Sequence, residues 1–463
     1  MDQERQYDAI IIGSGQAGGP LSTALVAAGR KTALIERIHI GGTCINDGCT
    51  PTKTMVASAR IAYLAGRSGD FGIETGPESI DMPAVRRRKQ AMVDEFRNGS
   101  TRSIRQGGAE IIMGDASFTS AKSVLVRLPD GAKLGLQAET IFINTGARPA
   151  VPPISGLDTV PYLDSTTIME LGEVPAHLLV LGGGYVGLEF SQMYRRFGSA
   201  VTIVQMGPHL LAREDDDVAD AVAGILREDG IEILLNASAT AVSPAAGTTM
   251  ELTVKTENGL TTLAGSHLLI AAGRSPNTGD LNLEAAGVEK DSRGFVKTSG
   301  RLETSTPGIY AMGDVSGSAQ FTHISYDDFR ILRDNLLHGG NRDRSDRLVP
   351  YTMFIDPQLG RVGITESQAR QAGRSIKVAR MPMSSVARAL EVSESRGFMK
   401  AVVDAETGQI LGCAVLGLEG GEIMAMMEIA MMGKLPYTAL LDGIFAHPTL
   451  AESLNTLFGS FEG

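Results

Sequence analysis

The sequence AIIIGSGQAG at residues 9–18 joins a short apolar run to the glycine spacing G-x-G-x-x-G, and LLVLGGGYVG at residues 178–187 repeats this arrangement. The apolar runs are typical of buried parallel strands, and the residues after each motif have the pattern of an amphipathic helix that ends near a further glycine. A second strand is expected after each helix, at residues 32–35 and 200–204. One such motif is weak evidence. Two, each in a strand-turn-helix-strand context, predict two Rossmann-like dinucleotide-binding units in an α/β fold.

Glycine is needed at three places in such a turn, each for a different reason. The first permits the tight turn, the second lets the backbone approach a pyrophosphate, and the third lets the helix pack closely on the strand. The N-terminus of the helix then stabilises the phosphate charge. The residues predicted for these places are Gly13, Gly15 and Gly18 in the first unit and Gly182, Gly184 and Gly187 in the second.

The residue at the end of the second strand differs between the two units. Glu36 in the first unit is a carboxylate that can accept hydrogen bonds from an adenosine ribose, whereas Gln205 occupies this place in the second. The missing acid removes the usual repulsion against a 2′-phosphate, although no arginine follows Gln205 directly. We therefore expect NADPH to be used at least as well as NADH, with Arg195, Arg196 and Arg213 as the nearby cations.

Length, charge and cysteine usage limit the possible functions. The 463 residues correspond to about three domains at about 150 residues each. The formal net charge of −11 argues against a nucleic-acid partner. Residues 1–8 are charged and the apolar run at 9–12 meets a glycine at once, so we expect neither a secretory signal nor a membrane partner. Three cysteines cannot form a disulfide framework, which favours a reducing, cytoplasmic location.

The sequence GGTCINDGCTPTK at residues 41–53 carries Cys44 and Cys49 and leads into a helix expected at residues 52–65. A thiol near a helix N-terminus has its thiolate form stabilised, and a neighbouring cysteine can capture it as a disulfide. Metal ligation is the alternative for this spacing. However, Cys413 is isolated and the histidines are scattered, so we predict no metal site.

These motifs, together with GIYAMGD at residues 308–314 and HPTLAES at residues 447–453, make the chain resemble a known family over its whole length. The family is the class I pyridine nucleotide-disulfide oxidoreductases, of the glutathione reductase, dihydrolipoyl dehydrogenase and mercuric reductase type. The resemblance implies FAD on the first nucleotide unit, NADPH or NADH on the second, and a homodimer with shared active sites. It implies four segments: residues 1–150 as the first part of an FAD-binding domain, 151–273 as an NAD(P)-binding domain, 274–345 as a central segment that completes the FAD site, and 346–463 as an α+β dimerisation domain.

The resemblance also assigns roles to residues near the thiols. It makes Cys49 the thiol next to the flavin and Cys44 the interchange thiol that meets the substrate. Lys53 matches the lysine beside the flavin, and Glu189 matches its carboxylate partner. A fixed ammonium there would stabilise negative charge on a reduced flavin. Tyr185 matches an aromatic residue that covers the flavin until nicotinamide enters.

Further cofactor contacts follow from the same resemblance. Asp314 matches the acid that binds the ribityl chain of FAD, and Ala116 belongs to a G-x-A-x-F strand beside the adenine. The remaining positions assigned to cofactor binding are Glu36, Arg37, Gly42, Thr43, Thr145, Gly146, Gly273, Arg274 and Gly313.

His447 and Glu452 in the C-terminal motif form a candidate acid-base pair. A histidine near the thiols can hold the proton exchanged with Cys44, and a carboxylate can orient its ring. A lone histidine before proline is most often a turn residue, but the motif favours the catalytic role, exercised on the thiols of the other subunit.

The electron acceptor is not identified by the motifs. The sequence around residues 50–52 and 321–328 looks like the mercuric-reductase branch, yet the C-terminal cysteine pair and the N-terminal metal-binding domain of many mercuric reductases are missing. A disulfide, metal-ion or quinone-type acceptor is therefore expected. Dihydrolipoyl dehydrogenase and a flavin-bound redox sensor are the alternatives. His323 either faces the flavin or caps a buried turn, and the second interpretation is slightly favoured.

Overall fold

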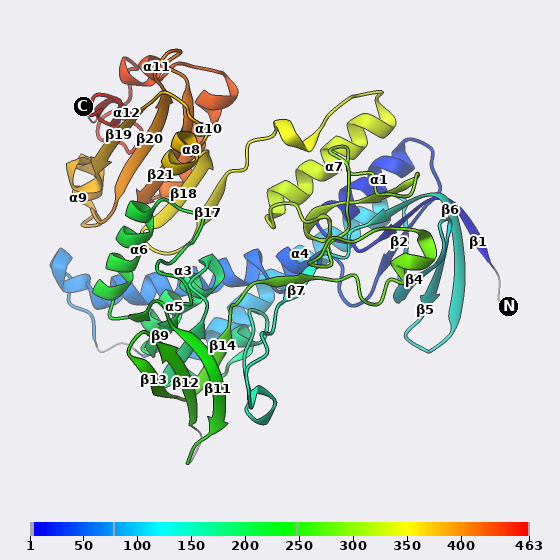
Figure 1. Cartoon of the computed structure of the whole chain (residues 1–463), viewed down its shortest axis with the longest axis horizontal. Helices are drawn as coiled ribbons and strands as arrows, with labels where there is room; N and C mark the ends of the chain where they lie inside the picture. Colours follow the sequence, from blue (N-terminus) through cyan, green and yellow to red (C-terminus); the bar gives the residue numbers. More distant parts are fainter. Residues whose placement is uncertain (1–3, 77–78, 247–248, 462–463) are drawn as a thin grey trace. The chain divides into compact units, whose positions relative to one another are not determined.

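The computed structural model describes residues 4–76, 79–246 and 249–461 of the chain (Figure 1). The chain divides into two compact units. Unit 1 comprises residues 1–55, 83–150 and 273–347, and unit 2 comprises residues 56–82, 151–272 and 348–463.

Unit 1 is built on a seven-stranded sheet with the order β3-β2-β1-β6-β5-β4, in which β16 also pairs with β6. The strands β1, β2, β3, β6 and β16 are parallel, whereas β4, β5 and β6 form an antiparallel meander. The bounds are β1 Arg5–Ile12, β2 Thr32–Glu36, β3 Glu110–Met113, β4 Asp115–Ser120, β5 Ser123–Arg127, β6 Lys133–Ile143 and β16 Ile309–Ala311. This is the expected Rossmann-like order around the first glycine motif.

The helices of unit 1 cover the parallel part of this sheet. Helix α1 (Gly18–Ala27) and helix α7 (Thr322–Leu337) lie side by side and share one apolar core with β1 and β2 (Figure 1). The short helix α2 (Gly42–Asn46) precedes α3 (Cys49–Gly66), whose first seven residues belong to unit 1. Helix α4 spans Met82–Gln106.

Unit 2 repeats the nucleotide-binding arrangement. Its parallel sheet has the order β10-β9-β8-β14, with bounds β8 His177–Leu181, β9 Ala200–Val204, β10 Glu232–Leu234 and β14 His267–Ile270. The helices between these strands are α5 (Tyr185–Phe197) and α6 (Asp216–Glu228). A separate antiparallel sheet contains β11 (Ser238–Pro244), β12 (Met250–Thr256) and β13 (Gly259–Gly265).

Two short strands, one after β6 and one after β14 in the sequence, pair with each other in unit 1. Strand β7 (Ala147–Pro149) and strand β15 (Arg274–Pro276) form a two-stranded antiparallel ribbon. One strand from the end of each nucleotide-binding region therefore lies in the same ribbon.

The C-terminal part of unit 2 is an α+β layer. Its five-stranded antiparallel sheet has the order β17-β18-β21-β20-β19, and α10 packs on β18 and β21. The strands are β17 Tyr351–Met353, β18 Gln358–Gly363, β19 Ile376–Pro382, β20 Phe398–Asp404 and β21 Ile410–Gly417. The helices are α8 Glu366–Gln371, α9 Ala387–Glu391, α10 Gly420–Met432, α11 Tyr437–Leu441 and α12 Ser453–Phe458.

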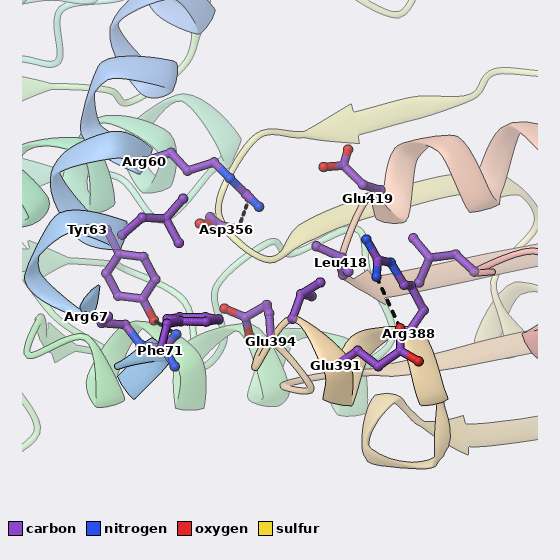
Figure 2. A pocket seen from close by; sticks show the side chains of 13 residues that line it. Arg60, Tyr63, Arg67, Phe71, Asp356, Arg388, Glu391, Glu394, Leu418 and Glu419 are labelled. Carbon is purple, nitrogen blue, oxygen red and sulfur yellow. Dashed lines mark hydrogen bonds and ion pairs between the residues drawn. The ribbon is translucent and has the colours of Figure 1, made fainter. Parts of the chain in front are cut away.

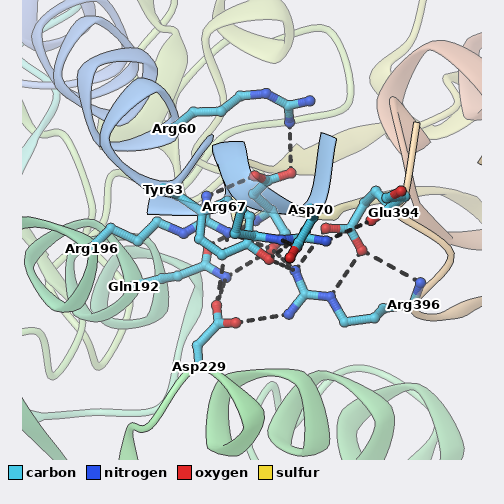
Figure 3. A network of polar contacts seen from close by, with 11 residues as sticks. Arg60, Tyr63, Arg67, Asp70, Gln192, Arg196, Asp229, Glu394 and Arg396 are labelled. Carbon is cyan, nitrogen blue, oxygen red and sulfur yellow. Dashed lines mark hydrogen bonds and ion pairs between the residues drawn. The ribbon is translucent and has the colours of Figure 1, made fainter. Parts of the chain in front are cut away.

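The second half of α3 is held in unit 2 by a network of ion pairs (Figure 3). Asp356 contacts the guanidinium groups of Arg60 and Arg196 at 2.6 and 2.7 Å. Asp229 contacts Arg396 at 2.7 Å. The guanidinium of Arg196 also stacks 3.9 Å from the ring centre of Tyr63. Because most of these groups are shielded from water, the network fixes the C-terminal half of α3 against α5.

The predicted fold class is confirmed, since both Rossmann-like sheets and the C-terminal α+β layer are present. Among the described residues, no helix combines the length and the apolar composition that a membrane span requires.

Candidate active site

The first glycine turn is packed too closely for side chains. Gly13 has a φ of +102°, and a Cβ there would overlap the carbonyl oxygen of Asn144. A Cβ on Gly18 would overlap the carbonyl oxygen of Gly13. A Cβ on Gly42 would lie 2.7 Å from the Cα of Gly15, so the residues just before Cys44 pass directly beside the turn.

Glu36 lies at the end of β2 and bonds to this turn. Its Oε2 accepts hydrogen bonds from the Ser14 hydroxyl at 2.6 Å and the Ser14 N–H at 3.1 Å. The neighbouring Arg37 contacts Asp115 at 3.8 Å, which places the start of β4, including Ala116, beside Glu36. The residues predicted for the adenosine end of FAD therefore gather at one edge of the sheet.

The other predicted FAD residues meet at the carboxyl ends of β6 and β16. The Arg274 guanidinium lies 3.7 Å from the Asp314 carboxylate, and burial raises the pKa of that carboxyl above its usual value. The buried Nε of Arg274 has no hydrogen-bond partner within the described residues. The Thr145 hydroxyl, beside Gly146, donates to the Asn277 carbonyl at 2.8 Å. A positively charged guanidinium and a carboxyl group beside a glycine turn are suited to bind a large polar ligand such as FAD.

Cys44 lies in α2, and Cys49 is the first residue of α3. The sequence predicts that this helix begins at Thr52, but it begins three residues earlier. Cys49 therefore lies at the positive end of the helix dipole. The hydrogen bond with Cys49 and burial raise the pKa of the Cys44 thiol, while the Lys53 ammonium acts in the opposite direction. Cys49 Sγ also lies 3.2 Å from the Thr322 hydroxyl, at the start of α7.

The second glycine turn has the same construction as the first. Gly182 has a φ of +115°, and a Cβ on it or on Gly187 would overlap a backbone carbonyl. Among the described residues, no atom beyond the immediate chain neighbours lies within 4 Å of a Cβ placed on Gly184, in the middle of the turn, and the same holds for Gly273. Tyr185 is the first residue of α5.

Glu189 and Gln205 are both held within unit 2. Buried Glu189 accepts a hydrogen bond from the Phe354 N–H at 2.7 Å. Its predicted partner Lys53 belongs to unit 1. Gln205 Oε1 accepts from the Gly183 N–H at 2.9 Å. Two of the cations considered near Gln205 bind elsewhere, since Arg195 donates to the Asp229 and Ser199 carbonyls and Arg196 pairs with Asp356.

His447 and Glu452 are hydrogen-bonded to each other. His447 Nδ1 lies 2.9 Å from Glu452 Oε2, and the His447 side chain is 73% exposed. His323 is exposed as well, and its ring stacks on Phe321 at a centroid distance of 5.5 Å.

Sequence reasoning did not single out three residues that contact this region. These are Thr322, Asn144 and Asp328. Thr322 and Asp328 lie inside the stretch at residues 321–328 that was compared with the mercuric-reductase branch, but such a stretch does not show which of its polar residues face the site.

A cavity of about 470 Å³ lies in unit 2 (Figure 2). Arg60, Tyr63 and Arg67 of α3 line one side, and Arg388 and Glu391 of α9 line the other. The charged groups are already paired, for example Arg60 with Asp356 at 2.6 Å and Arg388 with Glu391 at 3.1 Å. None of the residues predicted for the active site lines this cavity.

The chain matches known families over most of its length. Residues 7–328 match the pyridine nucleotide-disulphide oxidoreductase family, and residues 349–458 match the dimerisation domain of the same family. The Escherichia coli protein described as probable pyridine nucleotide-disulfide oxidoreductase RclA is 42% identical over 98% of this chain and 99% of its own length. The mercuric reductase of Lysinibacillus sphaericus is 34% identical over 99% of this chain and 83% of its own length.

A solved structure agrees with these matches. The Cu(II) complex of the HOCl-induced flavoprotein disulfide reductase RclA from Escherichia coli superimposes with a TM-score of 0.90 at 41% identity, over 98% of this chain and 99% of that one. The chain therefore belongs to the class I pyridine nucleotide-disulfide oxidoreductases and is an FAD-dependent enzyme of that family that uses NAD(P)H.

Proposed function

We propose that Cys44 and Cys49 form the redox-active pair of this enzyme and reduce an external acceptor. The observation that carries the proposal is the hydrogen-bonded contact of the two thiols at the start of α3, with Lys53 close by. FAD supplies the means to pass an electron pair from NAD(P)H to such a pair. When the dithiol closes to a disulfide, it releases two electrons and two protons to the acceptor and the solvent.

The two thiols have different tasks in this proposal. Cys49 is the residue favoured as thiolate, because it begins α3 and a helix N-terminus stabilises negative charge. Cys44 retains its proton more strongly and attacks the acceptor once that proton has been removed. Lys53 would supply a positive charge near the flavin. The roles of Glu189 as the partner of this lysine and of Tyr185 as the cover of the flavin are proposed from the family resemblance.

The proton of Cys44 needs a base, and we propose His447 for this role. Its ring is exposed and is oriented by Glu452 at 2.9 Å. In the proposed homodimer the pair serves the thiols of the other subunit. The dimerisation-domain match supports this, as do exposed apolar side chains in the same part of the chain, Ile429, Met432 and Ile444. We also propose that the domain boundaries lie at residues 150, 273 and 345. In addition, we propose that the protein is located in the cytoplasm.

For the acceptor we propose a soft or redox-active metal ion, with Cu(II) as the first candidate. RclA was solved as a Cu(II) complex, and other relatives are mercuric reductases. Thiolates are favourable ligands for such ions. Two Cu(II) ions would take the two electrons that the thiol pair releases and leave as Cu(I). A small disulfide is the second candidate, because the exchange between a thiol and a disulfide needs only Cys44 and a base.

Steady-state turnover tests this proposal. NADH and NADPH are each offered with Cu(II), Hg(II), glutathione disulfide, lipoamide and a quinone, with enzyme-free blanks for each metal. We expect Cu(II)-dependent oxidation of the nicotinamide that falls at least about a hundredfold in Cys44→Ser and in Cys49→Ser. Fast turnover with lipoamide alone would establish the dihydrolipoyl dehydrogenase alternative. No turnover with any acceptor would favour a redox sensor.

A further inference from the structure

Asn144 lies directly after β6, and its side-chain amide connects two segments that are distant in the sequence. Oδ1 accepts a hydrogen bond from the N–H of Gly18, the first residue of α1, at 2.9 Å. Nδ2 donates to the carbonyl of Met312 at 2.9 Å. The residue is only 6% exposed. One buried amide therefore joins the first glycine turn to the turn that carries Gly313 and Asp314.

Asp328 of α7 holds the same turn from the other side. Its Oδ2 accepts the N–H of Gly313 at 2.8 Å, and its Oδ1 lies 2.6 Å from the guanidinium of Arg347. Asp328 is fully buried, and burial raises its pKa while Arg347 and the Gly313 N–H act in the opposite direction. Within the described residues, the hydrogen bonds of this buried carboxylate go to the Gly313 N–H and to Arg347.

The second nucleotide unit shows that a Rossmann turn by itself does not need the amide of Asn144. Asn144 and Ala271 occupy equivalent places, because a Cβ on Gly13 would overlap the carbonyl of Asn144 and a Cβ on Gly182 would overlap that of Ala271. The methyl group of Ala271 cannot form hydrogen bonds. Unit 1 differs in that the turn at residues 312–314 lies beside its glycine turn, and Asn144 bonds to this second turn.

We propose that Asn144 and Asp328 are positioning residues of the FAD site. They fix the Met312–Asp314 segment against the first glycine turn, so that the Asp314 carboxylate and the N-terminus of α1 are presented to one ligand together. The inference rests on the assignment of FAD to this part of unit 1.

The test uses the holoenzyme and follows FAD release on dilution by the rise in flavin fluorescence. Asn144→Ala copies the residue of the second unit, and Asp328→Ala removes the acceptor for Gly313. Each is expected to raise the dissociation constant for FAD at least about tenfold, which corresponds to about 1.4 kcal/mol. Asp328→Asn keeps an acceptor oxygen and should recover part of the loss.

The control is Asp327→Asn on the same helix. Asp327 contacts Arg342 at 2.9 Å and Arg347 at 3.5 Å, and within the described residues it forms no hydrogen bond to the turn. This variant should bind FAD within about twofold of the wild type.

A second measurement separates positioning from folding. A variant that is impaired only in FAD binding recovers its unfolding temperature when FAD is added in large excess, because ligand binding stabilises the native state by mass action. We expect this recovery for Asn144→Ala and Asp328→Ala. A decrease in the unfolding temperature that excess FAD does not reverse would overturn the proposal. The proposal would also be overturned if both variants released FAD to the same extent as the wild type.

Asp314→Ala distinguishes a failure of the inference from a failure of the proposed site. If Asp314→Ala releases FAD readily while Asn144→Ala and Asp328→Ala do not, only the positioning role is wrong. If Asp314→Ala also retains FAD as the wild type does, the assigned FAD site is wrong and the inference falls with it.

Discussion

At the scale of single residues, the asymmetry between Cys44 and Cys49 is decided by their surroundings. Cys49 begins α3 and contacts the Thr322 hydroxyl, whereas the neighbouring thiol and burial raise the pKa of Cys44. Burial and the hydrogen bond with Cys49 therefore hold the proton of Cys44 more firmly than an isolated thiol would.

This asymmetry predicts the behaviour of the two serine variants. After two-electron reduction, the long-wavelength absorption band between a thiolate and the flavin should persist in Cys44→Ser and vanish in Cys49→Ser. Absorption spectra recorded during anaerobic titration with NADH check this. A band kept in Cys49→Ser and lost in Cys44→Ser would reverse the two roles.

Gln205 determines a second prediction at this scale. Glutamate at this position retains the acceptor for the Gly183 N–H but adds a negative charge where a 2′-phosphate would bind. Gln205→Glu should therefore lower kcat/KM for NADPH relative to NADH at least about tenfold, a difference of about 1.4 kcal/mol in transition-state binding. Kinetics with both nicotinamides measure the ratio. An unchanged ratio would show that residue 205 does not face the ribose.

At the scale of elements, a cluster of charges joins the start of α6 to the C-terminal sheet within unit 2. Asp215, just before α6, accepts the N–H groups of Glu366 and Ser367 at 3.0 Å each. Lys400 of β20 is 4% exposed and contacts Asp215, Asp217 and Glu366 within 3.0 Å. Burial raises the pKa of Asp215, but the hydrogen bonds from Ser367 and Lys400 outweigh burial and hold it below its usual value.

Removal of this lysine should destabilise the fold in a pH-dependent way. Lys400→Met removes the buried cation that Asp215, Asp217 and Glu366 share, although Arg380 still pairs with Asp217 and Arg370 with Glu366. The expected loss at pH 7 is about 3 kcal/mol in the free energy of unfolding. The pKa values of the Asp215 and Glu366 carboxyls are lowered in the wild type, so their contribution is present above about pH 4 and is lost as the pH falls. In the variant, the acids can take up protons as the pH falls, and this reduces the repulsion between their negative charges.

The difference in the free energy of unfolding between the wild type and Lys400→Met should therefore be smaller at pH 4.5 than at pH 7. Urea unfolding at both pH values measures it, and Lys377→Met on exposed Lys377 of the adjoining strand β19 is the control. A deficit of equal size at both pH values would contradict an electrostatic origin.

At the scale of the whole molecule, the proposed homodimer makes a prediction about mixed subunits. His447 lies near the end of the chain, and the proposal places it beside the thiols of the other subunit. His447→Ala should slow the thiol-disulfide half-reaction about a hundredfold or more while flavin reduction by NAD(P)H remains nearly intact. Rapid-reaction absorbance separates these two steps.

Mixing inactive Cys44→Ser and His447→Ala subunits tests the sharing directly. Random reassembly makes about half of the dimers mixed, and each mixed dimer has one complete site, so about a quarter of the wild-type disulfide-reductase activity should return. If mixed dimers form and remain inactive, the histidine serves the thiols of its own chain. The assay needs a disulfide that the wild type reduces, because a metal acceptor can bypass the base.

Local pattern was sufficient to predict the two nucleotide-binding units of this protein, whereas the C-terminal α+β domain was expected from the family resemblance. The two glycine motifs predicted both parallel sheets, and the strand at residues 200–204 has its expected bounds. Gly29 and Gly198 follow the ends of α1 and α5 with positive φ, as the sequence indicated. These features follow from the sequence alone because close backbone packing and positive φ at fixed spacings can be met only by glycine.

Tertiary structure decided which polar side chains serve the site. Asn144 and Ala271 occupy equivalent sequence positions, yet only the first has an N–H and a carbonyl from distant segments within reach. Arg196 is close to Gln205 in sequence but is paired with Asp356. Thr322 meets Cys49 across 273 positions of the chain. A hydrogen bond depends on distance and direction in space, and sequence separation does not determine either until the chain has folded.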